Sequence, residues 1–214
     1  MELYLIRHAQ SQNNALPEEQ RVEDPALTEL GNQQADCLGK WIPTLELTKV
    51  ITSPFLRALE TTRRIQEATK LTPEVRTAIH EMGGCCSGYP EVGMVGRPGM
   101  NRAEIELQFP AFQVAAEIDG EGWWRCQPYE TRALARQRAA DVLQQTREEF
   151  AHTSQRVAYI THADFNLLFL QHFHAEPLDV SCNTAVTKVL ITAEGCRLAD
   201  HNGVQHLPAH LIAR

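Results

Sequence analysis

Two histidines in this 214-residue chain each follow a short apolar run, and the first comes directly after an arginine. His8 follows Arg7 at the end of residues 3–6, and His162 follows residues 156–161. An imidazole beside a guanidinium combines a nucleophile or base with a group that binds anions. The pair therefore indicates chemistry on an anionic substrate. Taken alone, it would also fit a packed strand end.

The apolar runs predict the strands that position these side chains. Both runs are short, contain β-branched or aromatic residues and are bounded by polar ones, as buried strands are; residues 49–52 form a third such run. Helical segments between the runs require parallel neighbours, whose C-terminal ends share one edge of the sheet. We therefore expect His8, Arg57 and His162 to converge at that edge.

A helix is expected directly after the third run. Ser53 is the predicted N-cap and Pro54 the first helical residue, which places Arg57 in the first turn. The helical patterns cover about 31–42, 54–69, 101–108, 130–150 and 164–174, with an apolar stripe in the long one that includes Leu134; loops are expected at 16–25 and 82–98, and a β-hairpin at 184–192 and 196–201.

Five segments carry recognisable patterns, in this order: Arg7-His8-Ala9-Gln10-Ser11 with Asn14, Leu27-Thr28-Glu29-Leu30-Gly31, Ser53-Pro54-Phe55-Leu56-Arg57-Ala58-Leu59-Glu60-Thr61, His80-Glu81-Met82-Gly83 and Thr161-His162-Ala163. Together they resemble the signatures of the histidine phosphatase superfamily, also called the phosphoglycerate mutase-like family. The resemblance runs from residue 3 to about residue 190 and is poor between about 85 and 125. It implies a three-layer α/β/α sandwich with a mostly parallel central sheet.

The resemblance also implies roles for individual residues. His8 would attack phosphorus and form a phosphohistidine, with Glu81 as the acid for the leaving alcohol. The phosphate oxygens would be held by Arg7, Asn14, Arg57 and His162, and His162 also counts as catalytic. Ser11 and Asn183 are expected to support these groups from behind. Glu91, Glu104 and Glu106 remain open as alternatives to Glu81, and no metal or cofactor is required.

Two departures from the family pattern stand out. Alanine replaces glycine after both histidines, at Ala9 and Ala163, which is tolerable where φ is negative and costly where it is positive. Residues 84–88 replace the usual continuation of the acidic motif, and this puts the substrate in doubt. Residues 82–125 could line a pocket roof, although Trp123 and Trp124 could equally anchor a loop on the core.

Composition narrows the class of protein. The length and the 43% hydrophobic content fit one domain, 1–214, with a loop or cap insertion at about 82–125. No apolar run is long enough for a membrane span, no signal peptide is expected, and six cysteines without a metal or redox spacing favour a cytoplasmic location. The net charge of −7 and the lack of a basic block argue against nucleic acid.

Three functions are compatible with these residues. We favour a metal-independent phosphomonoesterase acting on a small phosphorylated metabolite. A phosphoglycerate mutase uses the same phosphohistidine but is usually longer, and a catalytically silent protein would bind a phosphorylated partner. Neither the substrate nor the oligomeric state can be read from the sequence.

Overall fold

Within the part of the chain that the computed structural model describes, residues 1–89 and 91–213, seven strands form one central sheet in the order β6-β3-β2-β7-β1-β8-β9. β1, β7, β2, β3 and β6 are parallel, whereas β8 and β9 are antiparallel at one edge. The strands are β1 (Glu2–Arg7), β2 (Lys49–Thr52), β3 (Glu74–Val75), β6 (Gln113–Val114), β7 (Arg156–Thr161), β8 (Val186–Ile191) and β9 (Cys196–Gly203). The expected C-terminal hairpin is therefore present as β8 and β9.

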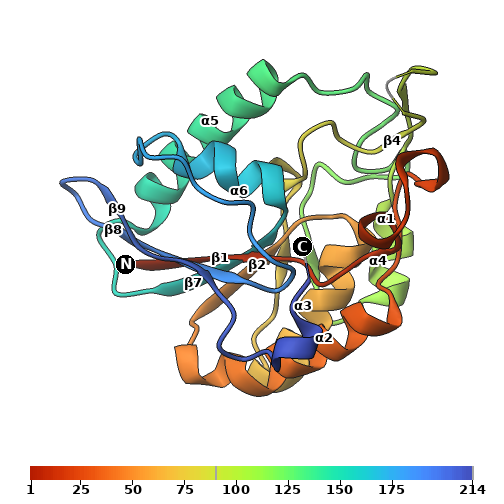
Figure 1. Ribbon diagram of the computed structural model, residues 1–214. Coiled ribbons are helices and arrows are strands. Elements are labelled where there is room, and N and C mark those ends of the chain that lie inside the picture. Colours follow the sequence, from red (N-terminus) through yellow and green to blue (C-terminus); the bar gives the residue numbers. More distant parts are fainter. Residues whose placement is uncertain (90, 214) are drawn as a thin grey trace.

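Helices cover both faces of the sheet (Figure 1). α5 and α6 lie on one side, and α2 and α3 lie on the other. The α-helices are α1 (Gln12–Ala15), α2 (Glu29–Trp41), α3 (Leu56–Thr69), α4 (Arg102–Gln108), α5 (Arg132–Phe150) and α6 (Ala163–Leu170); the short 3-10 helices are η1 (Glu18–Gln20), η2 (Ile42–Leu45), η3 (Thr77–Ile79) and η4 (Ala209–Leu211). The predicted three-layer α/β/α sandwich is confirmed.

The two sides of β1 contribute to two separate cores. Leu3 and Leu5 pack in the cluster that includes residues of α5 and α6, while Tyr4 and Ile6 pack with residues of α2 and α3. This alternation follows from the period of two along a strand, and burial on both faces explains why the strand has no polar side. The predicted apolar stripe on α5 is wrong at one residue. Leu134 lies in the first turn of α5 and is 61% exposed.

The register of the central strands brings their ends together. Arg7 is paired with Thr161, and Thr52 is paired with Ile160. The residues that follow these strands, His8, Ser53 and His162, therefore lie together at the C-terminal ends of the parallel strands.

The prediction for the start of α3 is wrong. The N-cap is Phe55 and the helix begins at Leu56, so Ser53 is not the cap and Pro54 is not the first helical residue. The Leu56 N–H instead donates to Asp24 Oδ1 at 2.8 Å. Asp24 comes from a loop that is distant in the sequence. Because it accepts from the Leu56 N–H, the Ser53 hydroxyl is available to contact His162. α6 is also shorter than expected, because it ends at Leu170.

The first turn of α2 requires a glycine at position 31. The side chain of Thr28 caps α2 by accepting from the Gly31 N–H at 3.0 Å. A Cβ added at Gly31 would lie 2.0 Å from the carbonyl oxygen of Gln10. The helix thus begins directly against the backbone that follows His8, and only glycine allows that approach.

Residues 82–89 and 91–125 pack on the body of the protein. β4 (Cys86–Ser87) and β5 (Val95–Gly96) form a short hairpin, followed by α4 and by β6 at the far edge of the main sheet. Trp123 is buried and its ring lies 4.8 Å from that of Phe55, and Trp124 is buried beside it. The tryptophans therefore anchor this segment on the core, which was the second of the two alternatives.

Candidate active site

His8 is held in one tautomer at the end of β1. Its Nδ1–H donates to the Ala9 carbonyl oxygen at 2.7 Å, which leaves the lone pair on Nε2. Arg57 Nε–H donates to that lone pair at 3.2 Å. Nε2 is thus an unprotonated ring nitrogen in direct contact with a guanidinium, as convergence of the strand ends predicts.

The surroundings keep His8 neutral. Its side chain is almost completely buried, and burial is the largest cause that lowers its pKa well below the ordinary 6.5. The positive charges of Arg57 and Arg7 lower the pKa further, because they penalise a third cation. An imidazole that stays unprotonated near neutral pH is available as a nucleophile.

Arg7 is a buried guanidinium with unused donor capacity. Its Nη1 donates to the Ser181 carbonyl oxygen at 2.6 Å, while its Nε has no partner among the residues that the structure describes. A buried donor without a partner is costly in a folded protein. An anion bound beside Arg7 would supply the missing acceptor.

His162 lies behind His8. The two rings are 5.1 Å apart, and the Phe55 ring lies 5.2 Å from that of His162. His162 Nε2 and the Ser53 hydroxyl form a 2.7 Å hydrogen bond, whereas Nδ1 has no partner among the described residues. When Ser53 donates to Nε2, Nδ1 carries the hydrogen and is a free donor close to His8.

Asn14 belongs to the same site, supported by the two residues predicted to stand behind it. The Ser11 N–H and hydroxyl donate to Asn14 Oδ1 at 3.0 and 3.1 Å. Asn183 Nδ2 donates to the His8 carbonyl oxygen at 3.1 Å and lies 3.5 Å from the same Asn14 oxygen. With Oδ1 occupied, the Asn14 amide nitrogen remains as the donor that this side chain offers to a ligand.

Glu81 lies in the loop after η3 and lines the same pocket as His8. Its carboxylate accepts from the backbone N–H groups of Met82 at 2.9 Å and of Phe165, in the first turn of α6, at 3.0 Å. Burial raises the pKa of Glu81, and Asp164 adds to the rise, whereas these N–H groups and Arg57 oppose it. A carboxyl with a raised pKa can carry a proton for a leaving group.

The alternatives to Glu81 lie elsewhere. Glu104 caps α4 by accepting from the Asn101 N–H, and Glu106 pairs with Arg102. Both glutamates are exposed, as is Glu91. Glu81 is the one of the four that lines the pocket with His8.

These side chains meet around one pocket of about 330 Å³, called the phosphate pocket below. Its walls come from the loop after β1, the start of α3, the loop after η3 and the start of α6. They include Arg7, His8, Ser11, Asn14, Arg57 and Glu81, and also Asn13, Arg21, Val22, Met82, Cys86, Met94 and Asp164. His162 and Asn183 do not line it and act from behind the wall.

Two contacts at this site could not be read from any local pattern. The Ser53 hydroxyl holds His162, although the sequence pattern assigned it to a helix cap. Asp24 caps α3 and lies 3.9 Å from Arg57 Nη1, across a sequence separation of more than thirty residues. Asp24 lies in residues 16–25, which the sequence predicts only as a loop. No residue spacing there indicates its contacts with α3.

The buried carboxylate of Asp24 lowers the stability of the folded protein at high pH. Burial raises its pKa to about 7 from 3.8, and its Oδ2 has no partner among the described residues. The folded protein therefore binds more protons than the unfolded chain between these values, and stability falls as the pH rises through that window. Asp24→Asn keeps the acceptor for the Leu56 N–H and removes the charge. We expect this variant to melt several degrees above wild type at pH 8, since each kcal/mol corresponds to about 2–4 °C in a chain of this size.

Near pH 4 the advantage of Asp24→Asn should shrink, because the wild-type carboxyl is then protonated in the folded state. Thermal melts of both proteins at the two pH values make the comparison. Identical melting temperatures at pH 8 would show that the Asp24 carboxylate is tolerated without cost.

The two alanines that replace family glycines fit without strain. Neither Ala9 nor Ala163 has a positive φ. The Ala9 N–H donates to Thr61 Oγ1 at 3.0 Å, and Ala163 is the first residue of α6. The extra methyl groups therefore sit in ordinary backbone conformations, as the interpretation of these positions required.

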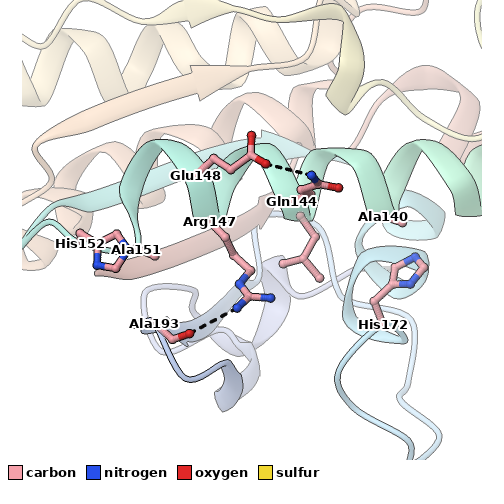
Figure 2. A pocket seen from close by; sticks show the side chains of 9 residues that line it. Ala140, Gln144, Arg147, Glu148, Ala151, His152, His172 and Ala193 are labelled. Carbon is pink, nitrogen blue, oxygen red and sulfur yellow. Dashed lines mark hydrogen bonds between the residues drawn. The ribbon is translucent and has the colours of Figure 1, made fainter.

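A larger hollow of about 850 Å³ shares no lining residue with the phosphate pocket, and Figure 2 shows the side chains that line it. It runs along α5 near the turn between β8 and β9, where Arg147 donates to the Ala193 carbonyl oxygen and Gln144 bonds Glu148. Neither strand-end histidine lines it. Its size alone does not make it a candidate active site.

Within residues 1–89 and 91–213, no group of three or more histidine, cysteine, aspartate or glutamate side chains is arranged to hold a metal ion. No helix there is long and apolar enough to cross a membrane.

Residues 3–203 match the family model described as the histidine phosphatase superfamily, branch 1. The chain belongs to this superfamily. Fructose-2,6-bisphosphatase TIGAR of Xenopus tropicalis is 30% identical over 76 residues, which are 35% of this chain and 27% of that protein. The similarity thus covers about a quarter of the relative's length.

Solved structures of the superfamily share the fold. YhfR of Bacillus stearothermophilus has a TM-score of 0.67 and 23% identity, covering 96% of this chain and 98% of its own. A mycobacterial glucosyl-3-phosphoglycerate phosphatase in complex with VO3 has a TM-score of 0.63 and 18% identity, with 95% and 99% covered. An Entamoeba histolytica phosphoserine phosphatase variant bound to phosphoserine has a TM-score of 0.62 and 21% identity, with 97% and 99% covered. The predicted phosphoglycerate mutase-like fold is confirmed.

Proposed function

We propose that this protein is a phosphomonoesterase that transfers the phosphoryl group of a small phosphate ester to His8 and then to water. The observation that carries the proposal is the neutral Nε2 of His8, facing a pocket shared with Arg7 and Arg57. A nucleophile surrounded by cations suits a substrate that brings its own negative charge.

In the first step, the lone pair of His8 Nε2 attacks phosphorus and the bond from phosphorus to the ester oxygen breaks. Arg57 must release Nε2 at this point, and its N–H then binds a phosphoryl oxygen. Arg7, whose Nε has no partner among the described residues, and the Asn14 amide nitrogen are the donors in the pocket wall for the remaining charge, while His162 acts from behind His8. Donors that are already held in the pocket wall stabilise the developing charge, and Arg57 is the donor that must change its partner.

Glu81 transfers a proton in each of the two steps. Its proton passes to the leaving oxygen, so that an alcohol departs and Glu81 becomes a carboxylate. Water then attacks the phosphohistidine, the bond from nitrogen to phosphorus breaks, and Glu81 takes a proton from the water. Inorganic phosphate leaves, and His8 and Glu81 regain their starting states.

Several relatives support this function by their names. The matched proteins include a bisphosphatase, a glucosyl-3-phosphoglycerate phosphatase and a phosphoserine phosphatase.

We also propose that residues 1–214 act as one domain, with 82–125 covering the site. A cytoplasmic location is supported by six cysteines that are all unpaired in the structure.

The proposal predicts phosphate release from p-nitrophenyl phosphate in the presence of EDTA, because the donors around the pocket are cationic side chains. A panel of phosphate esters, assayed with and without the chelator, makes the measurement, and conversion of 3-phosphoglycerate is followed in parallel. Loss of activity with EDTA and its return with a divalent ion would contradict the metal-independent mechanism. Transfer to 3-phosphoglycerate instead of water would place the protein with the mutases.

A further inference from the structure

A second pocket of about 370 Å³ opens beside the phosphate pocket. It is called the side pocket below, and its walls are Asn13, Glu18, Arg21, Val22, Cys86, Gly88, Tyr89, Met94 and Tyr129. Five of these residues line the phosphate pocket as well: Asn13, Arg21, Val22, Cys86 and Met94. A molecule whose phosphate lies against His8 can therefore extend directly into the side pocket.

The direction of the reaction favours that extension. Attack in line requires the leaving oxygen to lie opposite His8 Nε2, within reach of Glu81. The chain continues from Glu81 through Met82, on the wall of the phosphate pocket, to Cys86, which lines both pockets. The leaving group therefore departs on the side where the second pocket begins.

The walls of the side pocket are more apolar than polar, and some of their apolar side chains are partly exposed. Val22 is 47% exposed and Tyr129 is 41% exposed, although both are large apolar or aromatic side chains. Met94 contributes a flexible thioether at the junction of the two pockets. Exposed apolar side chains that gather at a concave site often mark a binding surface.

The Asn13 amide and the ion pair between Arg21 and Glu18 are polar contacts in the wall of this pocket. Asn13 Nδ2 donates to the Val22 carbonyl oxygen at 2.6 Å, and Asn13 Oδ1 accepts from the Val22 N–H at 3.0 Å. Arg21 pairs with Glu18 at 3.5 Å. The Asn13 amide is therefore occupied at both of its polar atoms, and the hydroxyl groups of a sugar that lie against Val22 and Met94 would lose hydrogen bonds to water.

We propose that the side pocket binds the leaving group, and that the enzyme prefers phosphate monoesters of aromatic or other apolar alcohols over polyhydroxylated ones. This inference rests on the proposed phosphomonoesterase function. Removing an aromatic ring from water favours binding by contact area, and the same contacts persist in the transition state. The preference should therefore appear in kcat/KM.

The test compares benzyl phosphate with glycerol 3-phosphate, whose alcohols leave with similar difficulty. The wild-type kcat/KM should be at least about tenfold higher for the benzyl ester, the discrimination that an apolar pocket commonly provides. Met94→Gln and Val22→Thr place polar atoms on the wall with little change of volume. Each should reduce the ratio of the two kcat/KM values several-fold. Leu107→Gln, on the exposed face of α4, is the control and should leave both values unchanged.

The outcomes separate the two claims. Equal kcat/KM values on both esters would overturn the preference. A ratio that survives both wall substitutions would show that the side pocket does not bind the leaving group. Either result would leave the phosphatase function standing. Failure of the wild-type protein to hydrolyse either ester or p-nitrophenyl phosphate would overturn the proposed function and the inference together.

Discussion

Replacement of His8 by alanine should reduce phosphate release by a factor of about 10⁴ or more, because no other described side chain offers an unprotonated nitrogen inside the phosphate pocket. The space left by the ring opens onto that pocket, so the fold should persist. Steady-state kinetics together with circular dichroism distinguish lost chemistry from lost structure.

His152→Ala is the matched control for that experiment. This histidine is exposed and lines the hollow along α5 (Figure 2), and it does not line the phosphate pocket. Its removal should leave turnover unchanged. A His8→Ala protein that keeps most of its activity would show that another group attacks phosphorus.

Glu81→Gln should separate the two kinds of leaving group. The amide oxygen can still accept from the Phe165 and Met82 N–H groups, but no proton is available for the leaving oxygen. An alkyl phosphate should lose a factor of roughly 10² to 10⁴ in phosphoryl transfer. A nitrophenolate leaves well without a proton, so the same step on p-nitrophenyl phosphate should be slowed far less.

Burst kinetics on both substrates isolate that first step for Glu81→Gln. Glu106→Gln is the control, because this exposed glutamate on α4 pairs with Arg102 and does not line the pocket. Equal losses on the two substrates would mean that Glu81 positions other groups and is not the acid.

Much of the site was predictable because it depends on strand ends. Arg7, His8 and His162 each follow an apolar run, and parallel strands bring such positions to one edge whatever the details of packing. The helix that carries Arg57 begins just beyond the third strand. Recognition of these strands was enough to predict that the residues meet, and the contact from Arg57 to His8 confirms it.

The remaining features depend on contacts between distant parts of the chain. Ser53 carries the pattern of a helix cap, yet Asp24 takes that place and the hydroxyl turns to His162. Apart from the helical pattern at 101–108, residues 82–125 carry no periodic pattern, and burial of Trp123 and Trp124 fixes the described part of this segment against the core. Such outcomes are decided by tertiary packing, which a local pattern does not contain.

The central claim is a covalent bond between phosphorus and His8, and rapid quenching tests it most directly. Wild-type protein mixed with a ³²P-labelled phosphate ester and denatured within milliseconds should retain label that is stable in base and labile in acid, on a peptide containing His8. The His8→Ala protein should retain none. Label on a different residue, or equal labelling of both proteins, would contradict the account.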